Sequence, residues 1–456
     1  MQARAKLQGR RAGRRLALGA VVCFILWPAV SAGHMADEAQ AAKPASALPQ
    51  NAATPKTKRF ELGVELRLRN EIRDNADFTA ADDFDHFLGY RLRLHLRAEL
   101  HPDLTAYVQA QDVWLFDARG DKVIHDLATN LHQAYFDWKP AGSERWSLRV
   151  GRQELIYGEE RLVGAFGWDN VGRSFDGLRL RFLQGAWSSD FFSSRQVDVR
   201  RAGARRRAGF QDLHGGYFTR APRDAVTRTE FYGLFLRDGL RSAGELNRAA
   251  ESTRLFTAGL RRVHQPKTGW RYSAEHAWQF GFRGPDAHRA AMLVATGGYA
   301  WGGRRQPRLQ VEYSFATGDR DPRDGRSREF HNLFPTNHIF YGYADLAGLR
   351  NLHDFRLTAA AALHPKLLVE ADYHRFLLAA KRGPWRNAGG RVLGFDATGA
   401  AGRDLGQEWD LTVRLPAHKR INLMGGYSIL LPGAFARRTR GPENHHFGYL
   451  QTTLRF

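Results

Sequence analysis

Apolar and polar residues alternate strictly over long stretches of this chain. Between residues 60 and 69 every second position holds Phe, Leu or Val, and the positions between them hold Glu, Gly or Arg. The same period of two returns over residues 88–99. A period of two places successive side chains on opposite faces of a β-strand. Further segments of this kind lie at residues 146–150, 178–182, 231–237, 270–280, 309–315, 367–376, 409–415 and 421–429, with a less regular one at 104–114.

These segments predict an all-β protein, because stretches rich in Gly, Pro, Asp and Asn separate them and no long segment has the apolar period of a helix. Alternation alone also suits a soluble β-sandwich whose polar face meets water. However, many segments reach about ten residues, the length that a tilted strand needs to cross a bilayer, whereas sandwich strands usually have about five or six. One face is dense in Arg, Glu and Gln, and the other carries Leu, Val, Tyr, Phe and Trp. We therefore expect a transmembrane antiparallel β-barrel with lipid outside and a wet lumen inside.

The length of the alternating region sets the size of this barrel. Residues 58–456 allow about 18 strands at about 22 residues per strand and connection, and 16 strands would also fit. A barrel of that circumference leaves an aqueous channel unless loops fill it. Residues 446–456 end on an aromatic residue and place Leu450, Thr452, Leu454 and Phe456 on one face. We expect this last segment to pair with the first strand and close the barrel.

The first 57 residues have a different character. Residues 1–15 contain six Arg or Lys and no acidic residue, residues 16–32 carry no charge, and Val30-Ser31-Ala32 offers small residues for cleavage. This pattern predicts a signal peptide over residues 1–32, with a retained membrane anchor as the alternative. Residues 33–57 lack apolar periodicity and are expected to form a flexible periplasmic linker. The only cysteine, Cys23, lies in the signal region, so the exported chain would contain no disulfide.

Three stretches of the predicted barrel resemble a known family. They are residues 151–177 with the sequences GRQEL and GRSFDG, residues 317–351 with TGDRDP and LFPTNH, and residues 406–433 with GQEWDL. In this order they resemble the alginate export family of outer-membrane porins. The resemblance implies an 18-stranded monomeric barrel whose arginine-lined pore passes a polyanionic polysaccharide passively. It does not fix the substrate.

The charge of the chain agrees with an anionic partner. The formal net charge is +21, and 58 of the 68 basic residues are arginine. A guanidinium holds a carboxylate with two hydrogen bonds and stays charged. Alternation, and for Arg152 the family resemblance, assign the following arginines to the pore: Arg67, Arg69, Arg91, Arg93, Arg97, Arg149, Arg152, Arg179 and Arg181. Arg152 follows Gly151, where alternation ends, and is the candidate for a constriction.

Two interpretations of these arginines stay open. An inner face with more Arg than Glu would concentrate uronate-like anions in an anion-selective pore. Alternatively, the arginines pair with Glu, Asp and Tyr across neighbouring strands and serve the structure. A separate cluster, Arg200, Arg201, Arg205, Arg206 and Arg207, could recruit the polymer or contact lipopolysaccharide phosphates, or form an ordinary solvated loop.

Other chemistry has weaker support in the sequence. Asp319, Asp321 and Asp324 precede a glycine as acidic residues do in calcium loops, but their spacing departs from the EF-hand pattern and Asx turns explain them. We therefore expect no metal and no cofactor. No HExxH, GxSxG or P-loop motif is present, and nothing orders His338, Asp345 and Ser327 as a relay, so we do not expect an enzyme. Aromatic residues and arginines fall on opposite strand faces, which argues against nucleic-acid binding.

The sequence thus predicts a bacterial outer-membrane porin for passive passage of an anionic polysaccharide, alginate or another polyuronate. The expected partners are this polysaccharide, outer-membrane lipid and lipopolysaccharide, with a periplasmic export complex as a further candidate, and the expected state is a monomer. A general anion-selective diffusion porin is the alternative within the same architecture. An outer-membrane enzyme is the alternative from another class.

Overall fold

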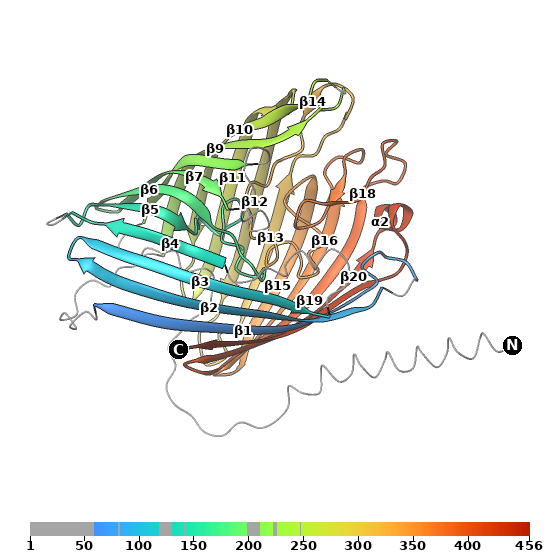
Figure 1. Cartoon of the computed structure of the whole chain (residues 1–456). Helices are drawn as coiled ribbons and strands as arrows, with labels where there is room; N and C mark the ends of the chain where they lie inside the picture. The colour runs from blue at the N-terminus through green and yellow to red at the C-terminus, as the bar shows by residue number, and fades with distance from the viewer. Residues whose placement is uncertain are drawn as a thin grey trace. The chain divides into compact units, whose positions relative to one another are not determined.

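The computed structural model describes residues 59–80, 83–117, 130–140, 143–197, 210–221, 226–246 and 248–456. The predicted signal peptide, the predicted linker and the arginine cluster at 200–207 lie outside the described residues. Eighteen long antiparallel strands form one closed barrel, as predicted (Figure 1). They are β1 (Phe60–Asp74), β2 (Asp85–His101), β3 (Leu104–Phe116), β4 (Asn130–Trp138), β5 (Trp146–Gln153), β6 (Phe175–Gln184), β7 (Trp187–Gln196), β8 (Gln211–Arg220), β9 (Thr227–Ser242), β10 (Glu251–His264), β11 (Gly269–Arg283), β12 (Asp286–Ala300), β13 (Arg308–Ala316), β15 (Leu352–His364), β16 (Leu367–Leu378), β19 (Asp404–His418), β20 (Ile421–Pro432) and β21 (His445–Arg455).

Four short elements lie in the connections between these strands. They are β14 (Arg326–Ser327), β17 (Trp385–Arg386), β18 (Val392–Gly394) and the helix α2 (Ala434–Thr439). β14 adds to the edge of β12 in a parallel pairing, and β17 pairs with β18. Within the described ranges, no helix is long and apolar enough to cross a membrane.

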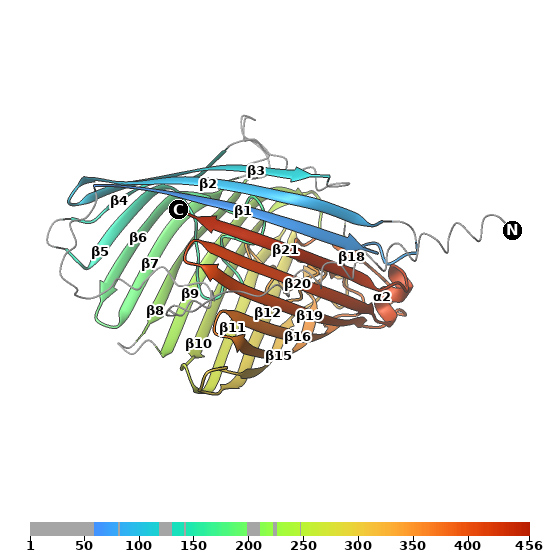
Figure 2. The ribbon, with the colours of Figure 1, turned by 90° about the horizontal axis from the view of Figure 1, so that it is seen from below.

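The barrel closes through its first and last strands. β1 and β21 pair in antiparallel register from Glu65 with Arg455 to Asp74 with His446, and the two strands lie side by side in Figure 2. The terminal Phe456 extends the ladder, because its N–H donates to the carbonyl of Val64 at 2.9 Å and its carbonyl accepts from the Val64 N–H at 3.0 Å. The prediction of a closing strand at the C-terminus is confirmed. Closure pairs the first strand with the last, so the sheet has no open seam there, as a wall in contact with lipid requires.

The connections differ at the two ends of the barrel. At one end, the turn end, short links such as Gly185–Ala186, Pro365–Lys366 and Lys419–Arg420 join neighbouring strands. At the other, the loop end, residues 154–174, 317–351 and 379–403 form long connections. The segments 154–174 and 317–351, called here inner loop 1 and inner loop 2, fold against inward-facing residues of the wall. The lumen is therefore partly filled by folded chain.

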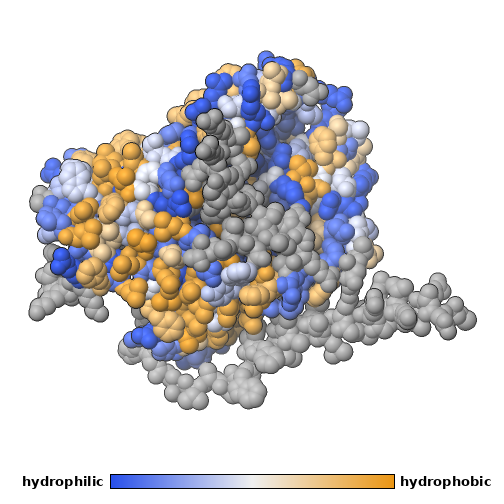
Figure 3. All heavy atoms as spheres, viewed as in Figure 1, coloured by the Kyte–Doolittle hydropathy of each residue, from blue (hydrophilic) through white to orange (hydrophobic). Residues whose placement is uncertain are grey.

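The outer wall is apolar because alternation is kept along the strands. Outward positions carry exposed large apolar side chains, among them Leu94, Val150, Trp278, Phe280 and Trp409. Figure 3 shows hydrophobic residues gathered over the lower and left parts of the visible wall, with hydrophilic residues more frequent at the top and right. An exposed apolar belt of this extent is stable against lipid and would aggregate in water.

Six strands have no counterpart among the segments predicted from alternation: β4, β7, β8, β10, β12 and β15. β12 shows one reason. Its inward residues Ala290, Met292 and Val294 are buried in the same apolar cluster as Phe330 and Phe334 of inner loop 2. Where a loop covers the inner wall, both faces of the strand become apolar or small, and the period of two disappears from the sequence.

Gly151 offers a test of how closely β4 and β5 pack in the wall. Gly151 in β5 has φ +129°, and an added Cβ would lie 2.3 Å from the carbonyl oxygen of Ala134 on β4. We expect Gly151→Ala to lower the free energy of unfolding by about 1–3 kcal/mol, through backbone strain and displacement of β4. The measurement is urea-induced unfolding of the barrel refolded into lipid vesicles. Gly297→Ala in β12, where a Cβ meets nothing within 4 Å, is the matched control and should change stability by less than about 1 kcal/mol. Equal stability of the two variants would contradict this account of β5.

Candidate functional site

Eight of the nine arginines assigned to the pore lie on the inner face of the wall. They alternate with outward apolar residues such as Leu68, Leu94, Val150 and Leu180. The eight are Arg67, Arg69, Arg91, Arg93, Arg97, Arg149, Arg179 and Arg181. The inner wall thus carries many guanidinium groups. Whether each of them can bind a solute depends on the acceptors that it already contacts within the protein.

Several of these arginines are neutralised by carboxylates on neighbouring strands. Arg149 donates two hydrogen bonds to Asp137, both at 2.7 Å. Arg181 binds Asp190 in the same way, at 2.7 and 2.8 Å. Such two-fold pairs fix the guanidinium plane and cancel most of its charge. The structural pairing that the sequence left open is present at these positions.

Arg69, Arg91 and Arg97 also face carboxylates. Arg69 donates to Glu71 at 2.7 Å and Arg91 donates to Glu65 at 2.8 Å. Arg97 is the loosest of the set, since its side chain is 50% exposed and lies 3.8 Å from Glu99. Pairing is therefore tight near the loop end of β1 and β2 and weak toward their turn end.

Arg179 differs from its neighbours. It faces Arg149 across the β5–β6 ladder and lies two residues from Arg181. Its Nε is buried and has no hydrogen-bond partner. Among the residues that the structure describes, the Arg179 side chain makes no hydrogen bond and no ion pair. Arg179 therefore lies on the inner face without a carboxylate partner, between two neutralised arginines.

The arginines of β1 and β2 hold inner loop 1 by its main chain. Arg67 donates to the carbonyls of Gly167 at 2.8 Å and Asp169 at 2.9 Å. Arg69 donates to the carbonyl of Trp168 at 2.6 Å, and its guanidinium lies 4.0 Å from the centre of the Trp168 ring. Arg91 reaches the carbonyl of Gly167 at 3.1 Å. These guanidiniums are engaged by the protein itself.

The hydrogen bonds of Arg93 complete this contact. It donates to Gln111 at 2.7 Å, lies 3.1 Å from Nε2 of His132, and its Nη2 is 3.4 Å from the carbonyl of Val171. Glu154, the first residue of inner loop 1, lies 3.7 Å from Arg93 and 2.8 Å from the same His132 nitrogen. Both ends of inner loop 1 are therefore tied to the first strands.

The two inner loops are joined to each other. The Gly164 N–H donates to the carbonyl of Phe334, and the Phe334 N–H donates to the carbonyl of Leu162, both at 2.9 Å. Arg173 adds a bond to the Phe334 carbonyl at 2.6 Å. Burial lowers the pKa of Arg173 to about 10 despite the nearby carboxylate of Asp169. The first two stretches of the family resemblance thus meet inside the barrel.

Two buried arginines that the sequence analysis missed anchor this inner body to the wall. Arg261 of β10 is 1% exposed and donates to Glu159 at 2.6 Å and Glu230 at 2.8 Å. Arg161 of inner loop 1 donates to Glu312 of β13 at 2.6 Å and to the Tyr341 hydroxyl at 3.1 Å. The doublet of Arg261 with Arg262 hides which residue faces inward, so alternation could not single out Arg261.

The expectation that Arg152 lies in the pore is not met. Arg152 shares its strand face with Leu148 and Val150, and Val150 is exposed on the outer wall. Its guanidinium binds Asp176 with two hydrogen bonds, at 2.7 and 3.1 Å. The inward position is taken by Gly151, whose left-handed backbone keeps the strand in register instead of turning Arg152 inward.

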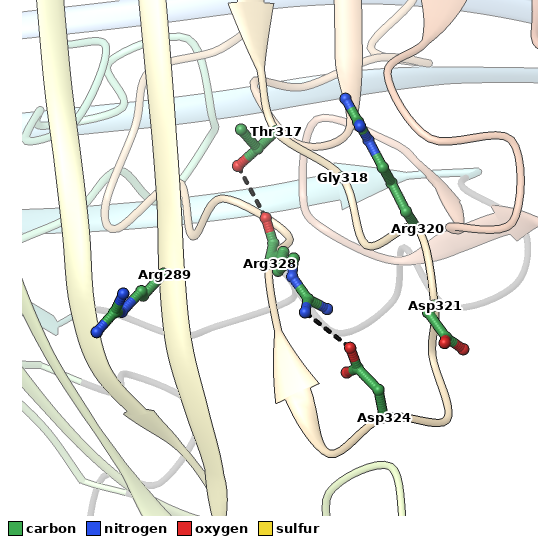
Figure 4. Close-up of a pocket in the computed structure, with 7 residues that line it drawn as sticks. All are labelled: Arg289, Thr317, Gly318, Arg320, Asp321, Asp324 and Arg328. Atoms are coloured by element: carbon green, nitrogen blue, oxygen red, sulfur yellow. Dashed lines mark hydrogen bonds and ion pairs between the residues drawn. The ribbon is translucent and has the colours of Figure 1, made fainter.

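The aspartates considered for calcium lie in turns. Asp319 accepts from the N–H groups of Asp321 and Arg328, and Asp324 binds the Arg328 guanidinium at 2.7 Å. Asp321 and Asp324 line a cavity of about 420 Å³ together with Arg289, Thr317, Gly318, Arg320 and Arg328 (Figure 4). Across the described ranges, no group of three or more His, Cys, Asp or Glu side chains is placed to hold a metal ion.

Of the three residues considered for a catalytic relay, the structure brings His338 and Asp345 into contact, whereas Ser327 has another partner. His338 lies 2.9 Å from Asp345 and stacks on Trp168, with ring centres 3.8 Å apart. Ser327 is hydrogen-bonded to His288 instead, at 3.1 Å. The His338 pair therefore packs inner loop 2 against inner loop 1 and has no serine beside it.

Comparisons with known proteins agree with this architecture. The sequence model of the family described as alginate export matches residues 58–449. The fold is similar to Pseudomonas aeruginosa OccK2 (OpdF), solved in complex with glucuronate, with a TM-score of 0.57, 11% identity, and coverage of 87% of this chain and 98% of that chain. It is also similar to OccK11 (OpdR) of the same organism, with a TM-score of 0.54, 14% identity, and coverage of 87% and 96%. Pseudomonas aeruginosa OprD gives a TM-score of 0.54 at 11% identity, with coverage of 87% and 94%. A comparison with curated protein sequences finds no significant match.

The anchor of inner loop 1 predicts a pH dependence. Burial would raise the pKa of Glu159, but Arg261 and Arg161 outweigh it and hold the pKa at about 2, below the ordinary 4.5. A carboxyl with a depressed pKa contributes stability above its ordinary value and loses it as the pH falls toward the depressed one. The contribution of Glu159 is therefore present at pH 5 and above and disappears between pH 4.5 and about 2.

We expect Glu159→Gln to be less stable than the wild type at pH 7, by up to about 3 kcal/mol, since each pKa unit is worth about 1.4 kcal/mol. This difference should shrink as the pH falls from 4.5 to about 2. The measurement is urea-induced unfolding in vesicles at a series of pH values. Glu144→Gln, in an exposed turn, is the control, and its difference in stability from the wild type should not change with pH. A stability difference for Glu159→Gln that stays constant with pH would contradict the role of Glu159 in anchoring inner loop 1.

Proposed function

This chain belongs to the alginate export family, and from that premise we propose that it is a porin through which an anionic polysaccharide, alginate or another polyuronate, passes passively. It is an outer-membrane protein, and its closed 18-stranded barrel is a transport channel of the porin kind. The finer proposal concerns the solute and the residues that select it.

The observation that supports an anionic solute is the state of Arg179. A uronate carboxylate needs a guanidinium whose donors are not already used. Arg149 and Arg181 have their own aspartates, whereas the Arg179 side chain, on the same inner face, has no carboxylate partner among the described residues. An anion bound there would complete the hydrogen bonding of the wall.

The pairing of most lumen arginines with carboxylates is consistent with a pore that lets a polyanion pass instead of binding it tightly. A pore lined by many unpaired guanidiniums would hold a polyanion too tightly for release, because conduction needs binding that is strong enough to enter and weak enough to leave. Pairs such as Arg149 with Asp137 leave local dipoles and a modest positive field. A polymer could move from one weak position to the next along such a wall.

A uronate is also the ligand named for a protein of similar fold, since OccK2 was solved in complex with glucuronate. At 11% identity the likeness concerns the fold, so this is support of a general kind. The extensive pairing of the lumen arginines favours the alternative, a general anion-selective diffusion porin, because few uncompensated charges remain to grip a polymer. The two functions differ in how strongly a polyuronate blocks small-ion current.

The test is electrical recording of the full chain refolded into planar bilayers. We expect the reversal potential under a salt gradient to report anion selectivity, and added polyuronate to block the current in a concentration-dependent way. Anion selectivity without block would favour the general diffusion porin. Cation selectivity would contradict both functions.

Arg179→Gln should weaken polyuronate block by about tenfold, because a charged hydrogen bond to a carboxylate is worth about 1.5–3 kcal/mol. Arg152→Gln removes the same charge from the outer face of the wall and is the control. The measurement is the half-blocking polymer concentration of each variant in the same bilayer assay. Equal block by both variants would remove Arg179 from the binding path.

A further inference from the structure

A second group of arginines lies at the loop end, apart from the wall around Arg179. Arg283 at the end of β11 donates to Glu329 of inner loop 2 at 2.8 Å. Arg386 of β17 donates to the other oxygen of the same carboxylate at 2.7 Å. Glu329 is 3% exposed, and both of its oxygens are used. One carboxylate therefore serves two guanidiniums.

Arg350, the third guanidinium of this group, has no such partner. It lies at the end of inner loop 2, and among the described residues its side chain makes no hydrogen bond or ion pair. Its guanidinium carbon lies 3.7 Å from the position of a Cβ built on Gly390, so it rests against the main chain of that turn. Burial, with repulsion from Arg283 and Arg386, lowers the pKa of Arg350 to about 10 even though Glu329 is near. The group carries more positive charge than Glu329 can balance.

His331 adds a neutral donor to the same place. Its Nδ1 accepts a hydrogen bond from the Leu333 N–H at 3.1 Å, so the ring proton lies on Nε2. Burial and the neighbouring Arg350 hold the pKa of His331 well below its ordinary value, which keeps the ring neutral. Its carbonyl accepts from Gln279 of β11 at 2.7 Å, which fixes this part of inner loop 2 to the wall.

A structural role explains Arg283 and Arg386, which tie β11 and β17 to inner loop 2 through Glu329. It does not explain Arg350, because a third cation beside two others costs energy unless an anion joins them. The side chains of Arg283 and Arg386 are 29% and 17% exposed and Arg350 is itself half-buried, so the group is in contact with solvent.

We propose that Arg350, flanked by Arg283 and Arg386, is a binding site for a uronate carboxylate at the loop-end mouth of the channel. This inference rests on the proposed function and adds to it a second position on the polymer path, held by residues of inner loop 2 and the connection 379–403. The planar guanidinium of Arg350 supplies the two parallel donors that a carboxylate takes.

The experiment uses the full chain in planar bilayers with glucuronate as the probe, added on one side and then on the other. Arg350→Gln removes the unpaired charge, and Arg382→Gln, which removes an exposed cation from the connection 379–403, is the matched control. We expect the residence time of glucuronate, added at the loop end, to fall about tenfold in Arg350→Gln and to stay within twofold of the wild type in Arg382→Gln. Unchanged residence times in Arg350→Gln would overturn the site.

Urea-induced unfolding of the same variants shows whether a lost response to glucuronate comes from a lost fold. Because Arg350→Gln relieves repulsion, its urea midpoint should equal or exceed that of the wild type, whereas Glu329→Gln, which leaves three cations together, should lower it. A lower midpoint for Arg350→Gln would mean that Arg350 has a structural partner and would overturn the proposal.

Binding to the detergent-solubilised chain separates the ligands. Tryptophan fluorescence, to which Trp385 next to Arg386 contributes, should change with glucuronate in the wild type and respond less in Arg350→Gln. A response to inorganic phosphate with none to glucuronate would assign the site to a phosphate group and overturn the carboxylate assignment. If glucuronate acts through Arg179 but not Arg350, only this inference fails, and if it acts through neither, the proposed function fails with it.

Discussion

A guanidinium that is buried in a protein wall has to find an acceptor, because desolvating an unpaired charge is expensive. The interior of this barrel is organised by that requirement. Along β4 to β7 the acceptors are carboxylates on the neighbouring strand, as for Arg149 and Arg181. Along β1 and β2 they are main-chain carbonyls of inner loop 1. The same residue type thus serves as a cross-strand tie in one part of the wall and as a clamp for a folded loop in another.

The clamp determines what else can happen in the lumen. Inner loop 1 is held by β1 and β2, bonded to inner loop 2 through Phe334, and anchored on the opposite wall by the contacts of Arg161 and Arg261. These contacts bridge the barrel from its first strands to β13. The path of a solute is therefore set by one connected inner body, and the arginines left without partners lie beside it. Only arginines that do not hold the inner loops in place are available to bind an anion.

The sequence predicted the wall better than the interior. Alternation identified the barrel, its approximate strand number, the closing strand, and the inward side of residues such as Arg149, Arg179 and Arg181, because these depend only on a period of two. It missed β12, whose inward residues are apolar where they meet inner loop 2. The expectation for Arg152 was wrong for another reason: it assumed a bend at Gly151, whereas β5 continues in register there and leaves Arg152 on the same face as Val150. Which arginines are paired depends on contacts between distant positions, such as Arg67 with Gly167, and no local pattern encodes these.

The way in which inner loop 1 is held has a consequence for how such channels diversify. Arg67, Arg69 and Arg91 grip carbonyl oxygens, which every amino acid supplies. These bonds use no side chain of residues 167–169, although Trp168 and Asp169 also pack and brace the loop, and Asn170 offers its own side chain to Arg67. The lining of the lumen can therefore drift by substitution while the scaffold that supports it stays constant. A wall of this kind allows descendants of one barrel to acquire new solutes without rebuilding the fold.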